Sequence, residues 1–146
     1  MPAAHPADPC SPILVVGIKP WKRWQITPFL TPGATGLKES VDDALRYVDA
    51  RDALKLAKAG RVREVVVWAA REPAGFAEAL AAHRVPLLRM EDGFLRSVGL
   101  GCNHIGGHSL VVDAQGIHFD PRQPSTLEPL LQHAPADASL LARAAA

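Results

Sequence analysis

The sequence lacks the features that mark membrane-spanning, secreted and nucleic-acid-binding chains. Its 146 residues contain no run of about 18 apolar residues, which a membrane-spanning helix would need. No basic segment followed by an apolar one opens the chain, so no signal peptide is indicated. The net charge is +1, from 16 basic and 15 acidic residues, which argues against nucleic acid as a general partner.

Cysteine is scarce, and the few metal-ligating side chains do not form a complete set. Cys10 and Cys102 cannot make a disulfide framework, and a cytoplasmic protein is the simplest expectation. Cys102, His104 and His108 could supply three zinc ligands, but no fourth follows at a suitable spacing, although His118 could reach them. We therefore expect no metal and no cofactor.

No GxGxxG or other phosphate-binding glycine motif is present, although the strand pattern is that of a nucleotide-binding fold. Residues 13–18 are a continuous apolar run with several β-branched side chains, residues 62–69 have VVVW (65–68) at their centre, and residues 85–90 begin with the apolar run VPLL (85–88). Such runs are typical of buried parallel strands. A further short strand is predicted near residues 35–38.

Helical patterns separate these strands. The spacing of apolar residues predicts a helix over 41–59, broken near Asp49 and capped by Gly60. Pro73 would open a second helix that runs to about His83. Ser125, with Glu128 at capping-box spacing, would start a third.

The order of these elements predicts a single Rossmann-like domain. Residues 1–12, with four prolines, are expected to form a flexible leader, and residues 134–146 an Ala-rich tail. Between them, residues 13–133 alternate strands and helices, which predicts an α/β fold with a parallel sheet and flanking helices. Residues 109–113 and 117–119 are predicted to pair as a hairpin.

The most informative stretch is MEDGFLRSVGLG, residues 90–101. Glu91 and Asp92 follow a predicted strand, which places carboxylates at the edge where open α/β sheets bind ligands. The basic and aromatic loop that contains Lys19 follows another predicted parallel strand, so it should open on the same edge. Gly93 would allow a positive φ or the close approach of a substrate, and Arg96 offers a planar cation for a carboxylate or phosphate. Asp-Gly is also a common turn dipeptide, so a simple strand-closing turn stays open as an alternative.

Four segments resemble the capsule polysaccharide biosynthesis proteins of the KpsC/LipB type, which are retaining β-Kdo glycosyltransferases. These segments are residues 17–23, the strand ending in Val67-Trp68, residues 91–101 and residues 116–125. The resemblance implies a GT-B architecture, in which the active site lies between two Rossmann-like halves. Only the first half is expected in this chain, so the second, nucleotide-binding half would be missing from it.

The resemblance also implies a reaction and a set of site residues. Kdo would pass from CMP-Kdo to a phospholipid-linked glycolipid acceptor, in the cytoplasm with peripheral contact at the inner face of the inner membrane. Asp92 corresponds to the family's nucleophile. The expected substrate-binding residues are Lys19, Arg23, Trp24, Glu91, Gly93, Arg96 and Ser97.

Three alternatives stay open at this stage. The chain could belong to a different CMP-sugar transferase of the sialyltransferase type, or it could be a non-catalytic remnant or interaction module. Core packing is the alternative role for Trp21 and Trp24, because large aromatic side chains are usually buried. Glu91 alternates to the other face of the strand end, where it would act as a structural hydrogen-bond acceptor.

Overall fold

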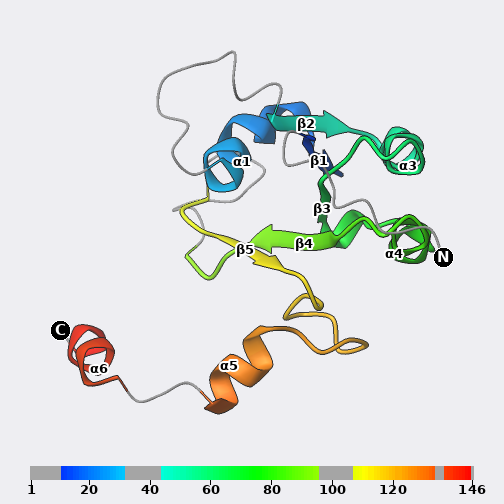
Figure 1. Cartoon of the computed structure of the whole chain (residues 1–146). Helices are drawn as coiled ribbons and strands as arrows, with labels where there is room; N and C mark the ends of the chain where they lie inside the picture. Colours follow the sequence, from blue (N-terminus) through cyan, green and yellow to red (C-terminus); the bar gives the residue numbers. More distant parts are fainter. Residues whose placement is uncertain (1–10, 32–43, 96–106, 134–136, 146) are drawn as a thin grey trace.

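The protein is built around one five-stranded sheet in the order β2-β1-β3-β4-β5 (Figure 1). The computed structural model describes residues 11–31, 44–95, 107–133 and 137–145. The strands are β1 (Ile13–Val16), β2 (Leu45–Val48), β3 (Glu64–Trp68), β4 (Leu87–Asp92) and β5 (Leu110–Asp113). The first four run parallel, and β5 pairs antiparallel with β4. The predicted Rossmann-like α/β fold is confirmed, with an antiparallel strand at one edge.

The strongest strand signals in the sequence correspond to the inside of the sheet. Every residue of β1 is buried, as are all residues of β3 except the first. β-Branched and large apolar side chains suit strands that are covered on both faces. The strands predicted over 13–18, 62–69 and 85–90 are therefore confirmed.

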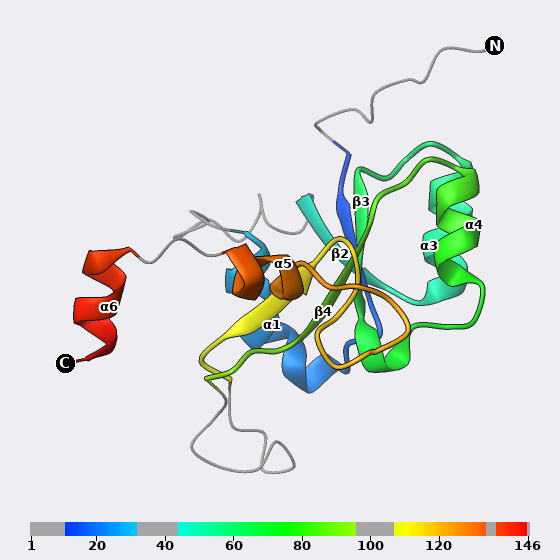
Figure 2. The ribbon, with the colours of Figure 1, turned by 90° about the horizontal axis from the view of Figure 1, so that it is seen from below.

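Helices cover both faces of this sheet (Figure 2). The helices of the described residues are η1 (Pro20–Lys22), α1 (Arg23–Leu30), α3 (Ala50–Lys58), η2 (Ala69–Arg71), α4 (Phe76–Ala82), α5 (Leu127–His133) and α6 (Ala138–Ala144), and α1, α3 and α4 are the ones that cover the sheet. On one face, α1 contributes Ile26 to a cluster with Val66 and Met90. On the other face, α3 and α4 close what we call the α3–α4 core, made of Leu14, Val16, Ala53, Ala57, Val62, Val65, Val67, Phe76, Leu80 and Val85.

The prediction of a helix over 41–59 is wrong for residues 45–48, which form β2 and pair with β1. The predicted break is real, because the Asp49 side chain accepts the Asp52 N–H at 2.8 Å and starts α3. Gly60 then ends α3 with φ of 65°, and the N–H of Arg61 donates to the Leu56 carbonyl at 3.0 Å. The predicted C-cap is confirmed as a Schellman motif. Residues 35–38 lie outside the described residues.

Two other boundaries differ from the predictions. The helix α4 begins at Phe76, and its N-cap Gly75 has φ of 71°, so Pro73 lies in the preceding turn and not at the first helical position. The strand β4 runs through Asp92, so the acidic pair ends this strand instead of following it.

The predicted hairpin is also wrong, since no strand forms at residues 117–119 and β5 pairs with β4 instead. The reason lies at Asp113, whose buried carboxylate accepts the N–H groups of Gln115 at 2.8 Å and of Thr126 at 2.7 Å. These bonds turn the chain away from the sheet toward α5. At the start of α5, Glu128 accepts the N–H of Ser125 at 3.1 Å, as the predicted capping box requires.

Candidate functional site

The carboxyl ends of β1, β3 and β4 lie together on one side of the sheet. Val16 is in register with Val67, and Trp68, the next residue, is in register with Met90. We call these three strand ends and the loops that follow them the strand-end edge. The expectation that the loops after β1 and β4 open on the same edge is confirmed, and open α/β sheets bind ligands at such edges.

An ion pair joins these two loops. Lys22 Nζ lies 2.8 Å from Asp92 Oδ1, and the two side chains are 16% and 25% exposed. The same ammonium lies 3.7 Å from the centroid of the buried Trp68 ring, a favourable cation–π arrangement. Lys22 is therefore fixed between the end of β3 and the carboxylate at the end of β4.

Asp92 lines a hollow of ≈ 500 Å³, which we call the β4 pocket. Its lining residues are Ala70, Glu91, Asp92, Gly93, Phe94, His118 and Phe119. Phe94 is 70% and Phe119 51% exposed, so aromatic faces form an open rim. The His118 ring lies 5.2 Å from that of Phe94, and its buried Nδ1 has no hydrogen-bond partner among the described residues. A carboxylate beside exposed aromatic faces suits the binding of a sugar ring.

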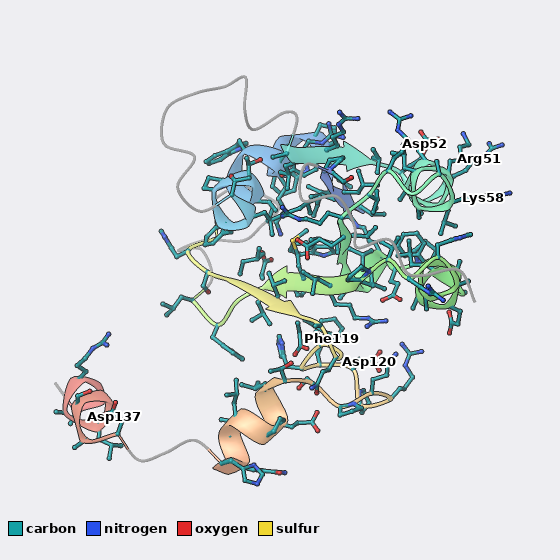
Figure 3. The ribbon with its side chains drawn as sticks, in the orientation of Figure 1. Arg51, Asp52, Lys58, Phe119, Asp120 and Asp137 are labelled. Atoms are coloured by element: carbon teal, nitrogen blue, oxygen red, sulfur yellow. The ribbon has the colours of Figure 1, made fainter. Side chains whose placement is uncertain are left out.

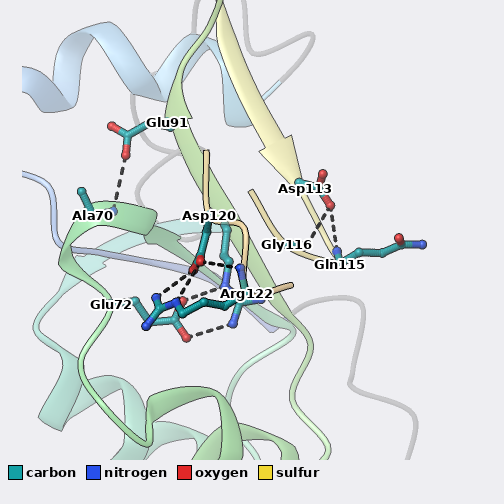
Figure 4. Close-up of polar contacts among 9 residues, drawn as sticks. Ala70, Glu72, Glu91, Asp113, Gln115, Gly116, Asp120 and Arg122 are labelled. Carbon is teal, nitrogen blue, oxygen red and sulfur yellow. Dashed lines mark hydrogen bonds and ion pairs between the residues drawn. The ribbon is translucent and has the colours of Figure 1, made fainter. Parts of the chain in front are cut away.

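Glu91 has a different hydrogen-bond partner from Asp92. Its Oε2 accepts the N–H of Ala70 at 3.4 Å (Figure 4), so the predicted acceptor role is confirmed. Burial raises the pKa of Glu91, and the Asp92 charge adds to this rise, while the Ala70 N–H partly offsets it. The two neighbouring carboxyl groups therefore have different environments. Two carboxyl groups in one site usually take different chemical roles because their environments differ.

Of the two roles expected of Gly93, the positive φ is wrong, and the close approach of a substrate stays a prediction. Its φ is not positive, because the only described glycines with positive φ are Gly17, Gly60 and Gly75. A Cβ at Gly93 would instead lie 2.8 Å from the Cβ of Ser109. Ser109 holds this segment by accepting the Gly93 N–H at its carbonyl, at 2.9 Å.

A second hollow of ≈ 200 Å³, the β1 pocket, lies beside the ion pair. Its lining residues are Gly17, Ile18, Lys19, Trp21, Lys22, Trp68 and Arg71. Gly17 has φ of 84° and accepts a 2.7 Å hydrogen bond from Arg71 Nη1 at its carbonyl. The predicted residue Lys19 is thus placed at the strand-end edge, together with two further cations.

Other predicted site residues lie elsewhere or outside the described part. The Arg23 guanidinium lies 5.0 Å from the Tyr47 ring centroid, and Arg23 lines neither of these two pockets. Trp24 is 67% exposed, so core packing is wrong for this residue. Arg96 and Ser97 lie outside the described residues.

Metal ligands and membrane spans were also predicted to be absent. Within the described ranges, no group of three or more metal-ligating side chains occurs; Cys102 and His104 fall outside these ranges. The helices of the described part are all too short or too polar to span a bilayer.

Polar contacts that the sequence analysis missed lie next to the β4 pocket (Figure 4). Arg89 makes a bidentate pair with Glu72, at 2.7 and 3.0 Å, and Arg122 binds Asp120 at 2.8 Å. The Arg122 hydrogen bonds lower the pKa of Asp120 to about 2. The one signal for these contacts was Arg89 itself, the single charge in the otherwise apolar stretch 85–90, since such a charge needs a partner.

The sequence profile of the family described as "Capsule polysaccharide biosynthesis protein" matches residues 63–144. The chain belongs to this family. It is 40% identical over 119 residues to the capsule polysaccharide modification protein LipA of Neisseria meningitidis, covering 81% of this chain and 16% of LipA. The lipopolysaccharide-processing protein LpsZ of Rhizobium meliloti is 35% identical over 123 residues, which cover 82% of this chain and 26% of LpsZ.

Two solved structures described as beta Kdo transferases share the fold. KpsC of Thermosulfurimonas dismutans, described as a beta Kdo 2,7 transferase, superposes with a TM-score of 0.58 and 27% identity, covering 91% of this chain and 40% of KpsC. A beta Kdo 2,4 transferase KpsC structure from the same organism gives 0.57 and 29%, covering 87% and 34%. The predicted resemblance is confirmed, and this chain spans well under half of each relative.

Proposed function

We propose that the protein containing this chain is a glycosyltransferase that transfers Kdo from CMP-Kdo to a glycolipid acceptor, with retention of configuration. A second Rossmann-like half, supplied outside these 146 residues, would hold the nucleotide. The observation that carries the proposal is Asp92, held by Lys22 at the carboxyl end of β4 and facing a pocket rimmed by aromatic side chains. The Kdo transferase descriptions of the two structural relatives support the choice of sugar.

In the first step, a carboxylate oxygen of Asp92 attacks the anomeric carbon of the donor sugar. The bond between that carbon and the phosphate oxygen breaks, and CMP leaves with the electron pair. Attack from the face opposite the leaving group inverts the configuration and leaves the sugar esterified to Asp92. A short side chain at the end of a paired strand suits this role, because its position is fixed before the substrate arrives.

In the second step, a hydroxyl of the acceptor attacks the same carbon and releases the Asp92 carboxylate. The hydroxyl proton leaves to water, and a second inversion restores the original configuration. Glu91, Gly93 and Lys19 lie at the strand-end edge and are proposed to contact the sugars. Arg23, Trp24, Arg96 and Ser97 keep their predicted binding roles within this proposal. A glycolipid acceptor would place the enzyme in the cytoplasm, at the inner face of the inner membrane.

The covalent intermediate gives the most direct test. The protein with both halves should gain the mass of one Kdo residue when incubated with CMP-Kdo without acceptor, and peptide mapping should locate the adduct on Asp92. An adduct with CMP-sialic acid and not with CMP-Kdo would favour a transferase of the sialyltransferase type. An adduct on any other side chain would exclude Asp92 as the nucleophile, and transfer with inversion would exclude the two-step mechanism.

A further inference from the structure

The β1 pocket has the charge of an anion site. Three cations line it, Lys19, Lys22 and Arg71, and its described lining residues include no aspartate or glutamate. Trp21 and Trp68 add aromatic surface to the same lining. Its volume of ≈ 200 Å³ lies below the range of about 300–1,000 Å³ usual for drug-sized ligands. The pocket therefore suits one small anionic group, such as the carboxylate of an acidic sugar.

Lys22 lies on the boundary between this pocket and the nucleophile. It lines the β1 pocket, whereas Asp92 lines the β4 pocket, and the 2.8 Å ion pair joins the two. An ammonium has three N–H donors, and the hydrogen bond to Asp92 uses one of them. The Trp68 ring, 3.7 Å from Nζ, supports the cation from one side. Lys22 can thus donate to Asp92 and to a second acceptor in the β1 pocket at the same time.

The chemistry of an ulosonic acid makes such a shared cation useful. In these sugars the carboxylate is bonded directly to the anomeric carbon, the atom that Asp92 would attack. Attack requires the reacting atoms to approach to about 3–3.5 Å, so the sugar carboxylate must come close to the carboxylate of Asp92. Two like charges at such a distance repel each other strongly. A cation that contacts both carboxylates removes this repulsion and orients the sugar at once.

We propose that Lys22 is the specificity-determining residue that bridges Asp92 and the carboxylate of an ulosonic acid, whose ring lies in the β4 pocket and whose carboxylate enters the β1 pocket. This proposal rests on the proposed function, since it takes Asp92 as the nucleophile. Sugars without a carboxylate on the anomeric carbon leave Lys22 with one partner only and are discriminated against. Lys22 binds the carboxylate of the substrate and also positions the side chain of Asp92.

Binding of free sugars to the 146-residue chain tests the charge requirement without any variant. We expect free Kdo, titrated into the labelled chain at millimolar concentrations, to shift NMR signals of Gly17, Trp21 and Trp68. The methyl ester of Kdo has the same ring without the charge and should bind about tenfold more weakly, as expected for loss of a charge-assisted hydrogen bond. Equal binding of acid and ester, or no binding of Kdo, would overturn the proposal. Shifts of the same residues with CMP alone would identify a phosphate site instead.

Variants then identify the cation. Lys22→Met keeps a side chain over Trp68 but removes the charge, and it should reduce the preference for Kdo over its ester from about tenfold to near unity. Lys22→Arg should retain most of that preference. The matched control is Lys58→Met, on the outer surface of α3 (Figure 3), which should bind like the wild type. A Lys22→Met chain that still prefers the acid tenfold would contradict the proposal.

The two proposals can fail separately. If Kdo binds through Lys22 but no adduct forms on Asp92, the carboxylate site stands and the mechanism falls. If an adduct forms on Asp92 while the chain does not distinguish Kdo from its ester, the mechanism stands and the role of Lys22 falls. In the protein with both halves, Lys22→Met should raise KM for the donor and lower kcat, and Lys22→Arg should restore KM more than kcat, because Arg keeps the charge but changes the contact with Asp92.

Discussion

The α3–α4 core and the strand-end edge meet within a single strand, yet they are built from opposite kinds of side chain. Val67 of β3 belongs to the core, and the next residue, Trp68, lies under the Lys22 ammonium at the edge. The core is apolar throughout, whereas the edge brings Lys22 and Asp92 together from loops far apart in the sequence. The comparison indicates that folding stability resides mainly in the core, whereas the proposed chemistry would take place at the edge.

The same contrast holds for the polar groups around each region. Beside the core, the ends of α3 are closed by the Asp49 side chain and by the turn at Gly60, as a stable helix requires. At the edge, burial raises the pKa of Glu91, and the Nδ1 of His118 has no hydrogen-bond partner in the described part of the chain. Perturbed groups of this kind gather at functional sites more often than in structural cores.

The largest expected effect comes from the edge. In the protein with both halves, Asp92→Asn should lower transfer by at least about 1,000-fold, because the amide cannot form the sugar ester. The fold should remain, with a loss of about 1 kcal/mol in the free energy of unfolding when Lys22 loses its charged partner. Rates of transfer and thermal unfolding of the same preparation would be compared. Near-normal turnover of Asp92→Asn would mean that Asp92 is not the nucleophile and that Glu-Asp-Gly is a simple strand-closing turn.

The opposite result is expected in the core. Leu80 is fully buried between α4 and the sheet, so Leu80→Ala should lower the free energy of unfolding by about 2–5 kcal/mol. Binding of Kdo by the molecules that remain folded should not change. Leu131→Ala is the matched control, because Leu131 lies exposed on α5, and it should cost less than about 0.5 kcal/mol. Denaturant unfolding and sugar titration of the three proteins would separate stability from binding.

The core could be predicted from the sequence because its signal is local and continuous. Runs of β-branched residues predicted the strands β1 and β3, and Gly60 predicted the end of α3. The strand β2 was missed because it has only four residues, Leu45–Val48, too few for an alternating pattern to stand out from the helical one that follows. The hairpin failed because the Asp113 side chain captures backbone N–H groups that a turn would otherwise use.

The edge could be predicted only in part, because its contacts are long-range. Sequence order placed Lys19 and Asp92 at the same edge, since parallel strands end together. The pairing of Lys22 with Asp92 joins residues 70 positions apart, and no local pattern encodes such a pair. The packing of Ser109 against Gly93 likewise depends on β5 pairing with β4, which the sequence analysis missed.

A smaller effect is expected where packing and chemistry meet. Gly93→Ala introduces a Cβ that would lie 2.8 Å from the Ser109 Cβ, so β4 and β5 must shift apart, at a cost of about 1–3 kcal/mol. The change should also lower transfer, because Asp92 is the adjacent residue. In a Ser109→Gly background the cost of Gly93→Ala should fall in part, since the side chain is gone while the backbone carbonyl carbon of residue 109, 2.9 Å from the added Cβ, remains. An equal cost in both backgrounds would show that the Ser109 side chain does not determine the need for glycine.

The smallest expected effect is that of Glu91→Gln, which is the matched control for Asp92→Asn. Transfer should fall far less than with Asp92→Asn, because Glu91 serves as a hydrogen-bond acceptor for Ala70 and the amide oxygen can replace it.

The effect of Glu91→Gln on stability should depend on pH, since burial raises the pKa of Glu91 above its ordinary value of 4.5. Between 4.5 and the raised pKa, the folded state holds a proton that the unfolded state has lost, so wild-type stability falls as pH rises through this window. The Glu91→Gln variant lacks this dependence, so its free energy of unfolding should rise relative to that of the wild type from acid to neutral pH. Denaturant unfolding of both proteins across this range measures the difference, and a difference of the opposite sign would mean that Glu91 is stabilised as a carboxylate and belongs with Asp92 in the chemistry.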